Sequence, residues 1–377
     1  MAQTREQASI ENQRFLPHGP GAKRRWRAGE TAAEYITAHT FWTGNGRDAL
    51  EVAYATATRR PTMQAVRETW KKRHGNRSTP VMLVIGFAEH GKLLAQVCGP
   101  SGEQPQVATL SLSHAERIAA TALAEPDRHM AHTFVVRSLT DEGEAIPGLR
   151  NRGLLSSHEI AHGVPKRSDW VAATERASTL LDLRGQDLVD ALGYTAESRG
   201  RYSVLRTNEG YARAVAIFLH DDELPDLPSS RHDHQTPVTY ALAQAERDNL
   251  PYVISVRNNQ LRLYSTATTG AVGQRGRTET YVELDLPLLA PEQAGYLDLL
   301  FSAHALTENG SLAQIRQDSA EFTNALSERL RERVYLEVVP RLAIAVANAR
   351  NGEPTQASLD EDYHVAMTIL FRLLFVA

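Results

Sequence analysis

The sequence predicts an α/β protein with a helical C-terminal part. Up to about residue 290, short apolar runs bounded by turn residues alternate with segments of helical periodicity, a pattern typical of sheets covered by helices. From residue 291 onwards the pattern is entirely helical. A length of 377 residues with 42% hydrophobic residues is enough for more than one core. We therefore expect two α/β domains followed by a helical segment.

The first part of the chain divides into an arm and a domain. Residues 1–30 are polar and contain Pro17, Gly19, Pro20 and Gly21, so we expect a mobile basic arm. Residues 31–165 are expected to form the N-terminal α/β domain. Its expected elements are a mainly helical stretch over 30–74, strands over 80–86, 93–98 and 107–112, a helix with Ser113 as N-cap and Glu116 in the capping-box position, and a helix over 127–140.

A second domain is expected over 166–290, after a Gly/Pro-containing boundary at 163–168. Its order of helix, two strands, helix and a strand hairpin predicts a mixed sheet. The expected elements are a helix from Ser168 or Asp169 to Leu192, strands over 202–206 and 212–219, a helix over 236–249, a hairpin over 252–256 and 260–265, and a strand over 280–286.

The last segment, 291–377, is expected to be a helical connector. It ends in the apolar run Met367–Ala377, which has no cap and no Gly or Pro stop signal. A helix that is apolar on nearly all sides must be buried. We therefore expect the connector to be truncated, with the part that covers this helix outside the given chain.

Composition excludes several classes of protein. No run of about 18 apolar residues is present, so we expect no membrane partner, and the charged N-terminus does not resemble a signal peptide. The single Cys98 excludes an internal disulfide framework, and a reducing cytoplasm is the expected location.

Positive charge is concentrated near the N-terminus. Residues 1–80 contain 14 Lys and Arg against 7 Asp and Glu, although the whole chain has a net charge of −4. The best candidates for phosphate contacts lie in two clusters: Arg24, Arg25, Lys71, Lys72 and Arg73. Such clusters attract nucleic acid through release of counterions. A solvated basic surface explains the charges at least as well.

The segment His158-Glu159-Ile160-Ala161-His162 matches the zinc-hydrolase pattern H-E-x-x-H. On a helix, the two histidines share one face and can bind one zinc ion, while the glutamate acts as general base. Gly163 and Pro165 follow at once, however, so the helix would end at the second ligand. A chance match near a helix end is the simpler interpretation of His158 and His162.

Carboxylates also follow an apolar strand, at Asp221-Asp222-Glu223. Acidic residues at a strand end are typical ligands for the Mg²⁺ of a nuclease. A solvated turn is the simpler interpretation of these three residues. The polar residues His232, Asp233 and His234 allow the same two interpretations.

Three stretches resemble the N-terminal region of large single-chain restriction–modification proteins of type IIG character and of phage-defence (DISARM- or BREX-like) adenine-N6 DNA methyltransferases. They are the helix of 235–246, the hairpin of 250–264 and the final run of 366–377. The resemblance implies a PD-(D/E)XK nuclease-like domain, then a helical connector and a methyltransferase. In that family Glu175 matches an acid on the leading helix, and Gln235 matches the glutamine that opens the following helix.

The chain departs from this family at the metal site. The first-strand acid would fall near 202–204 and the acid–x–Lys within 215–220, and neither is present. The nuclease-like domain is therefore expected to be degenerate. The Asn-Pro-Pro-Tyr motif, which grips a flipped adenine, is absent from the sequence. S-adenosylmethionine is thus expected only with a downstream methyltransferase domain.

The sequence is therefore interpreted as a DNA-engaging or scaffolding region of a restriction–modification or phage-defence methyltransferase, without catalysis of its own. DNA and other defence-system subunits are the expected partners, and no cofactor is expected in this chain. One alternative is an active Mg²⁺-dependent endonuclease using Glu175, Asp222, Glu223 and Gln235. The other is a zinc hydrolase using His158, Glu159 and His162.

Overall fold

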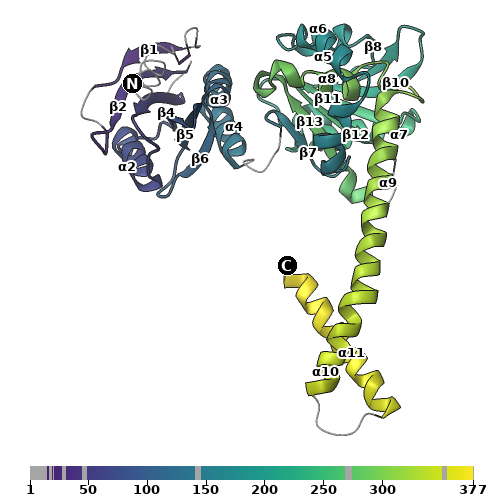
Figure 1. The fold of residues 1–377 in the computed structure, drawn as a ribbon. Coiled ribbons are helices and arrows are strands. Elements are labelled where there is room, and N and C mark those ends of the chain that lie inside the picture. The colour runs from purple at the N-terminus through teal and green to yellow at the C-terminus, as the bar shows by residue number, and fades with distance from the viewer. Residues whose placement is uncertain are drawn as a thin grey trace.

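The computed structural model describes residues 15–16, 19, 21–27, 31–44, 49–140, 146–267, 274–349 and 355–376. Figure 1 shows two α/β units, followed by a helical arm that leaves the second unit. Of the expected arm at residues 1–30, residues 1–14, 17–18, 20 and 28–30 lie outside the described residues. The described part of that segment contains a strand and three buried side chains, Phe15, Leu16 and Trp26.

The N-terminal unit is built on a six-stranded mixed sheet in the order β1-β2-β3-β4-β5-β6. Its strands are β1 (Ala22–Arg25), β2 (Ile36–Thr43), β3 (Glu51–Ala57), β4 (Val81–Glu89), β5 (Lys92–Gly99) and β6 (Gln106–Ser111). Only β3 and β4 run parallel among these pairs, and the helix α2 (Met63–His74) joins them. The expected strands β4, β5 and β6 are confirmed, and a tight turn at His90-Gly91 joins β4 to β5.

Helices cover both faces of this sheet. On one face, Val66 and Trp70 of α2 pack with Trp26, Leu83 and Ile85 in one core cluster. The other face carries α3 (Leu112–Ala124) and α4 (Arg128–Thr140), which pack in a second core cluster. The burial of the sheet on both faces explains why β4 is an almost continuous apolar run.

Two expectations for this unit were wrong. The stretch over 30–74 is not mainly helical, because it contains β2 and β3 before α2. The β-branched and aromatic residues of β2 favour a pleated strand, whereas the alanine-rich β3 is held between β2 and β4 by tertiary pairing. The N-cap of α3 is Ser111 rather than Ser113, since Ser111 Oγ accepts a hydrogen bond from the His114 backbone N–H at 3.2 Å.

The second unit contains a seven-stranded mixed sheet in the order β7-β13-β12-β11-β10-β9-β8. Its strands are β7 (Leu149–Asn151), β8 (Tyr194–Ser198), β9 (Ser203–Thr207), β10 (Ala212–Phe218), β11 (Tyr252–Arg257), β12 (Gln260–Ser265) and β13 (Tyr281–Asp285). β10 and β11 run parallel, and the helix α7 (Pro237–Arg247) connects them. The strands expected over 202–206, 212–219, 252–256, 260–265 and 280–286 are confirmed, whereas β8 was not expected.

One face of the second sheet is covered by α5 (Trp170–Ser178), α6 (Gly185–Ala191) and α8 (Gly295–Phe301). The opposite face is covered by α7. The single helix expected up to Leu192 is therefore broken into α5 and α6. Gly185, with a φ of +53°, starts α6, and its backbone N–H donates to the carbonyl of Asn258 at 2.7 Å.

The change from one sheet to the next comes earlier than the expected boundary at 165/166, because β7 pairs with β13 of the second sheet. At the other end, α8 belongs to the second core rather than to the connector expected from residue 291. The helical arm consists of α9 (Ser311–Glu332), a π-helical turn η7 (Arg333–Val338), α10 (Val339–Ala349) and α11 (Gln356–Val376). Helical structure in the C-terminal part is thus confirmed, and α10 and α11 cross at its far end (Figure 1).

The arm carries large apolar side chains on its surface. Leu336 is 74% exposed and Phe371 is 53% exposed, so the burial expected for the final apolar run is not reached at Phe371. No helix in the described parts of the chain has the apolar length that a bilayer crossing requires.

Candidate nucleic-acid interface

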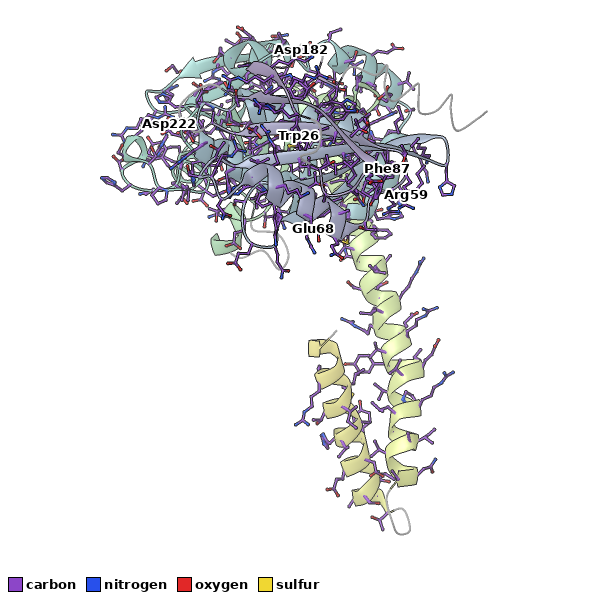
Figure 2. All side chains as sticks on the ribbon, turned by 90° about the vertical axis from the view of Figure 1, so that its left-hand side faces the viewer. Trp26, Arg59, Glu68, Phe87, Asp182 and Asp222 are labelled. Atoms are coloured by element: carbon purple, nitrogen blue, oxygen red, sulfur yellow. The ribbon has the colours of Figure 1, made fainter. Side chains whose placement is uncertain are left out.

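The fold brings the two basic segments of the N-terminal unit together at the edge strand β1. Arg24 pairs with Phe41 of β2 across the antiparallel ladder. Directly opposite residues of such a ladder lie on the same face of the sheet. Phe41 packs against the core cluster that contains α2, so Arg24 lies on the α2 face. Figure 2 looks onto this unit and shows Trp26 at its centre and Glu68 of α2 below it.

Alternation along β1 places Arg25 on the opposite face of the sheet. Lys23, which shares that face, lies with its Nζ atom 5.6 Å from the ring centroid of Trp42. Trp42 belongs to the core cluster under α3 and α4. The structure therefore brings Arg24, but not Arg25, to the side of the sheet that carries Lys71, Lys72 and Arg73.

The helix α2 presents its positive charges in its last turn. Lys71, Lys72, Arg73 and His74 precede Gly75, which adopts the left-handed conformation and ends the helix. Cations in a last turn are favoured by the negative end of the helix dipole. Lys72 is held near the chain that follows β1, because its Nζ donates to the carbonyl oxygen of Thr31 at 3.0 Å.

Arg73 joins the two basic segments physically. Its guanidinium carbon lies 4.0 Å from the ring centroid of Phe41 and 5.5 Å from that of Trp26. Its Nε and Nη2 atoms donate to the two carboxylate oxygens of Glu51 at 2.6 and 2.9 Å. Such a bidentate pair fixes the orientation of the guanidinium. Arg73 is therefore fixed against the sheet and projects less toward a ligand than the exposed Lys71 and Lys72.

Arg77 adds a second guanidinium to the same carboxylate. Its Nη1 lies 3.3 Å from Glu51 Oε2, and its side chain is 43% exposed. Glu51 is only 2% exposed and balances one of the two arginines. We use the name basic face for the following set of residues: Arg24, Lys71, Lys72, Arg73 and Arg77. Glu68 and Glu103 border this face, since they line a shallow depression together with Lys71.

The residues proposed for a Mg²⁺ nuclease are not gathered at one site. Glu175 is exposed on α5, on the face of the second sheet opposite to α7. Asp222 is exposed in the turn after β10 and lies at one edge of the molecule in Figure 2. Gln235 is exposed and does not cap α7, because Thr236 is the N-cap.

Glu223 is engaged in holding its own loop. It accepts hydrogen bonds from Ser229 Oγ at 2.6 Å and from the His220 backbone N–H at 3.0 Å, and it forms an ion pair with Arg231. Burial of the carboxyl alone would raise its pKa. These hydrogen bonds, the strongest from Arg231, outweigh burial and lower the pKa of Glu223 to about 2. The geometry indicates a structural loop anchor.

The H-E-x-x-H segment forms a π-helical turn, η1 (Glu159–Gly163), instead of an α-helix. The ring of His158 stacks on that of Phe322 with centroids 4.1 Å apart, and the centroids of His158 and His162 are 5.0 Å apart. A Cβ atom added at Gly163 would meet the Glu159 carboxyl group. Burial and the neighbouring Asp318 raise the pKa of Glu159.

Across the described residues, no three His, Cys, Asp or Glu side chains lie together as a metal site would require. Cys98 is buried, and burial raises its pKa to about 12. Glu51, Trp26 and Phe41 organise the basic face, but they could not be predicted from the sequence. An acid and two aromatic residues gain this role only through contacts distant in sequence.

Comparison of the chain with models of protein families and with curated proteins finds no match, and comparison of the fold with solved structures finds none.

Proposed function

We propose that this chain is the DNA-engaging, non-methylating region of a restriction–modification or phage-defence DNA methyltransferase. In this proposal the basic face of the N-terminal unit contacts the phosphate backbone of DNA. Arg24, Lys71 and Lys72 make the contacts, Arg77 contributes positive charge, and Arg73 positions the others through Glu51 and Phe41.

One observation carries the proposal. Two basic segments more than 40 residues apart meet on the same face of one sheet, through the contacts of Arg73 with Trp26 and Phe41. Surface charges that serve only solubility would have no reason to gather on one face in this way. Cations gathered on one face release counterions from a phosphate backbone, which makes binding strong at low salt and weak at high salt. Contacts to phosphates carry no sequence information, so weak sequence preference follows.

The order of elements in the second unit supports a nuclease-like scaffold. A helix precedes the meander β8-β9-β10, the helix α7 follows it, and β11 then runs parallel to β10. In the family that the sequence resembles, β9 and β10 would be the two strands that carry the metal-binding acids. β9 and β10 carry no Asp or Glu at all. The order of elements and the missing acids together support a nuclease-like scaffold without the strand carboxylates of a Mg²⁺ site.

Among the residues that the structure describes, no contact favours the nuclease or the zinc-hydrolase alternative, and neither Mg²⁺ nor Zn²⁺ enters the proposal. S-adenosylmethionine would act only in a methyltransferase domain, and docking to other defence-system subunits remains a prediction.

The experiment is a comparison of DNA affinity between the full chain and two double variants. Binding of fluorescent duplexes of unrelated sequence is followed by anisotropy at fixed, low salt. Lys71→Ala with Lys72→Ala is expected to weaken binding to every duplex by a similar factor, because phosphate contacts carry no sequence information.

Arg329→Ala with Arg331→Ala is the matched control. It removes the same charge from exposed positions of α9, far along the arm from the basic face. The control is expected to bind DNA as the unaltered chain does. Equal weakening by both double variants would indicate a nonspecific effect of net charge and would contradict the proposal.

A further inference from the structure

The junction between the two α/β units contains a buried cluster of charges. Arg137 of α4 lies with its Nη1 atom 3.5 Å from Glu283 and its Nη2 atom 3.4 Å from Asp285, both on β13 of the second unit. A second ion pair crosses the same junction, from Arg257 to Glu125 at 3.1 Å. The two units are therefore joined by opposite charges removed from solvent.

Apolar and backbone contacts close the junction around these charges. Leu288 of the turn η5 (Leu286–Leu288) is buried in the core cluster of the N-terminal unit. The Nε of Arg117 on α3 donates to the carbonyl oxygen of Leu288 at 3.1 Å. A cavity of about 100 Å³ remains beside them, and Arg137 and Asp285 both line it. The space is too small for a nucleotide, so the charges face one another instead of a large ligand.

Asp285 is the least compensated member of this cluster. Its side chain is buried, yet its ion-pair partner Arg137 is 3.4 Å away and also serves Glu283. Glu283 has two further arginines, Arg150 at 3.8 Å and Arg262 at a closer distance. Asp285 shares Arg137 with Glu283, which has further arginines beside it, so the buried Asp285 carboxyl is costly to ionise.

We propose that this junction is a protonation-controlled latch: Asp285 takes up a proton when the two α/β units close on each other, and the closed junction loosens as the pH rises past neutrality.

The titration of the neighbouring groups supports the latch. Burial, opposed by Arg137 and reinforced by Glu283 and Glu125, raises the pKa of Asp285 from 3.8 to about 7. The charged or titratable groups that face it are Arg137, Glu283, Glu125, Arg257, Arg150 and His114. Burial and Arg117 lower the pKa of His114 to about 4, so that ring is neutral near pH 7.

Glu283 is ionised throughout this range, because Arg137, Arg262 and Arg150 outweigh its burial and lower its pKa. The sign of the effect follows from linkage. A carboxyl whose pKa is higher in the closed junction than in the open one favours closure when it is protonated. The contribution of protonated Asp285 to closure of the junction is complete below its ordinary pKa of 3.8. It is lost as the pH rises through about 7.

The test measures the distance between the units in the full chain as a function of pH. Fluorophores are attached at Glu103→Cys and Glu209→Cys, which are exposed positions on the two units, and energy transfer is recorded from pH 5.5 to 9. The buried Cys98, whose pKa is raised to about 12, does not compete for the label. We expect energy transfer to change with a midpoint near pH 7.

Asp285→Asn keeps the shape of a protonated carboxyl and is expected to abolish this pH response, with the junction closed at every pH. Asp298→Asn is the matched control, because Asp298 is also buried and pairs with an arginine, Arg176, away from the junction. This control should retain the response. A flat trace in the doubly labelled parent chain overturns the latch, whether or not D285N folds, and so does an unchanged response in D285N.

Discussion

Glu51 is a buried carboxylate that holds two arginines of the basic face. Arg73 contacts both of its oxygens, and Arg77 approaches them from the exposed side. Removal of one member from a buried ion pair leaves an uncompensated charge, which is more costly than the pair itself is stabilising. The residue therefore controls both the stability of the N-terminal unit and the place of its cations.

Glu51→Gln is expected to lower the free energy of unfolding by about 3–5 kcal/mol, because the guanidinium of Arg73 would stay buried without its carboxylate. Urea denaturation measures this change. Glu89→Gln is the control, since Glu89 pairs with Arg60 at 3.5 Å on the surface. Exposed pairs are worth at most about 1 kcal/mol. Equal losses for the two variants would refute the structural role of Glu51.

Glu223 gives a prediction of pH dependence. Its pKa is lowered from 4.5 to about 2, so its stabilising contribution is present above pH 4.5 and is lost as the pH falls through about 2. By linkage, the contribution is roughly 3 kcal/mol at most. Urea denaturation at pH 5 and pH 2.5 should show a larger loss of stability for the parent chain than for Glu223→Gln. Equal losses would show that Glu223 is not the anchor of its loop.

At the scale of elements, the helix α3 connects the N-terminal core to the junction. Ser111 caps its first turn, and Arg117 on the same helix reaches the carbonyl oxygen of Leu288 in the second unit. The stability of this helix therefore bears on the contact between the units.

Ser111→Ala is expected to cost about 1 kcal/mol of unfolding free energy, the usual value for loss of an N-cap side chain. Ser113→Ala lies two residues further on, inside the helix, and should cost less than half as much. Chemical denaturation of both variants distinguishes the cap observed in the structure from the one that the capping-box pattern predicts. A larger effect at Ser113 would favour the pattern.

Elements with strong local signals could be predicted from the sequence. The apolar run of β4, the turn at His90-Gly91 and the hairpin of β11 and β12 are all present. The strand β3 could not be predicted, because its alanines favour a helix and only pairing between two other strands holds it extended. β8 gave no signal of its own and is defined by its pairing with β9.

The candidate site was predictable only in part, for the same reason. The charges of Arg24, Lys71 and Lys72 are visible in the sequence, whereas the side of the sheet on which each lies depends on strand register. A shift of one residue in β1 would exchange Arg24 and Arg25 between the two faces. Glu51 and Asp285 gain their roles through burial, which a single charge in a sequence does not reveal.

At the scale of the whole molecule, we propose that the basic face engages DNA through its phosphates. The N-terminal sheet carries this face. The second unit contacts the N-terminal unit at the junction, and the helical arm extends from the second unit (Figure 1). If a small number of cations on one face contact phosphates, the DNA-binding constant should fall with salt concentration by a defined slope. Nonspecific adsorption or a metal-dependent site would not give that slope.

The most direct test is the slope of the logarithm of the DNA-binding constant against the logarithm of salt concentration. Each phosphate contact contributes roughly −0.9 to that slope on duplex DNA. The variant with Arg24, Lys71 and Lys72 all replaced by Ala should therefore have a slope shallower by about 3 than the parent chain, on any duplex sequence. An identical slope for the two proteins, or parent-chain binding that does not respond to salt, would show that the basic face does not engage DNA phosphates.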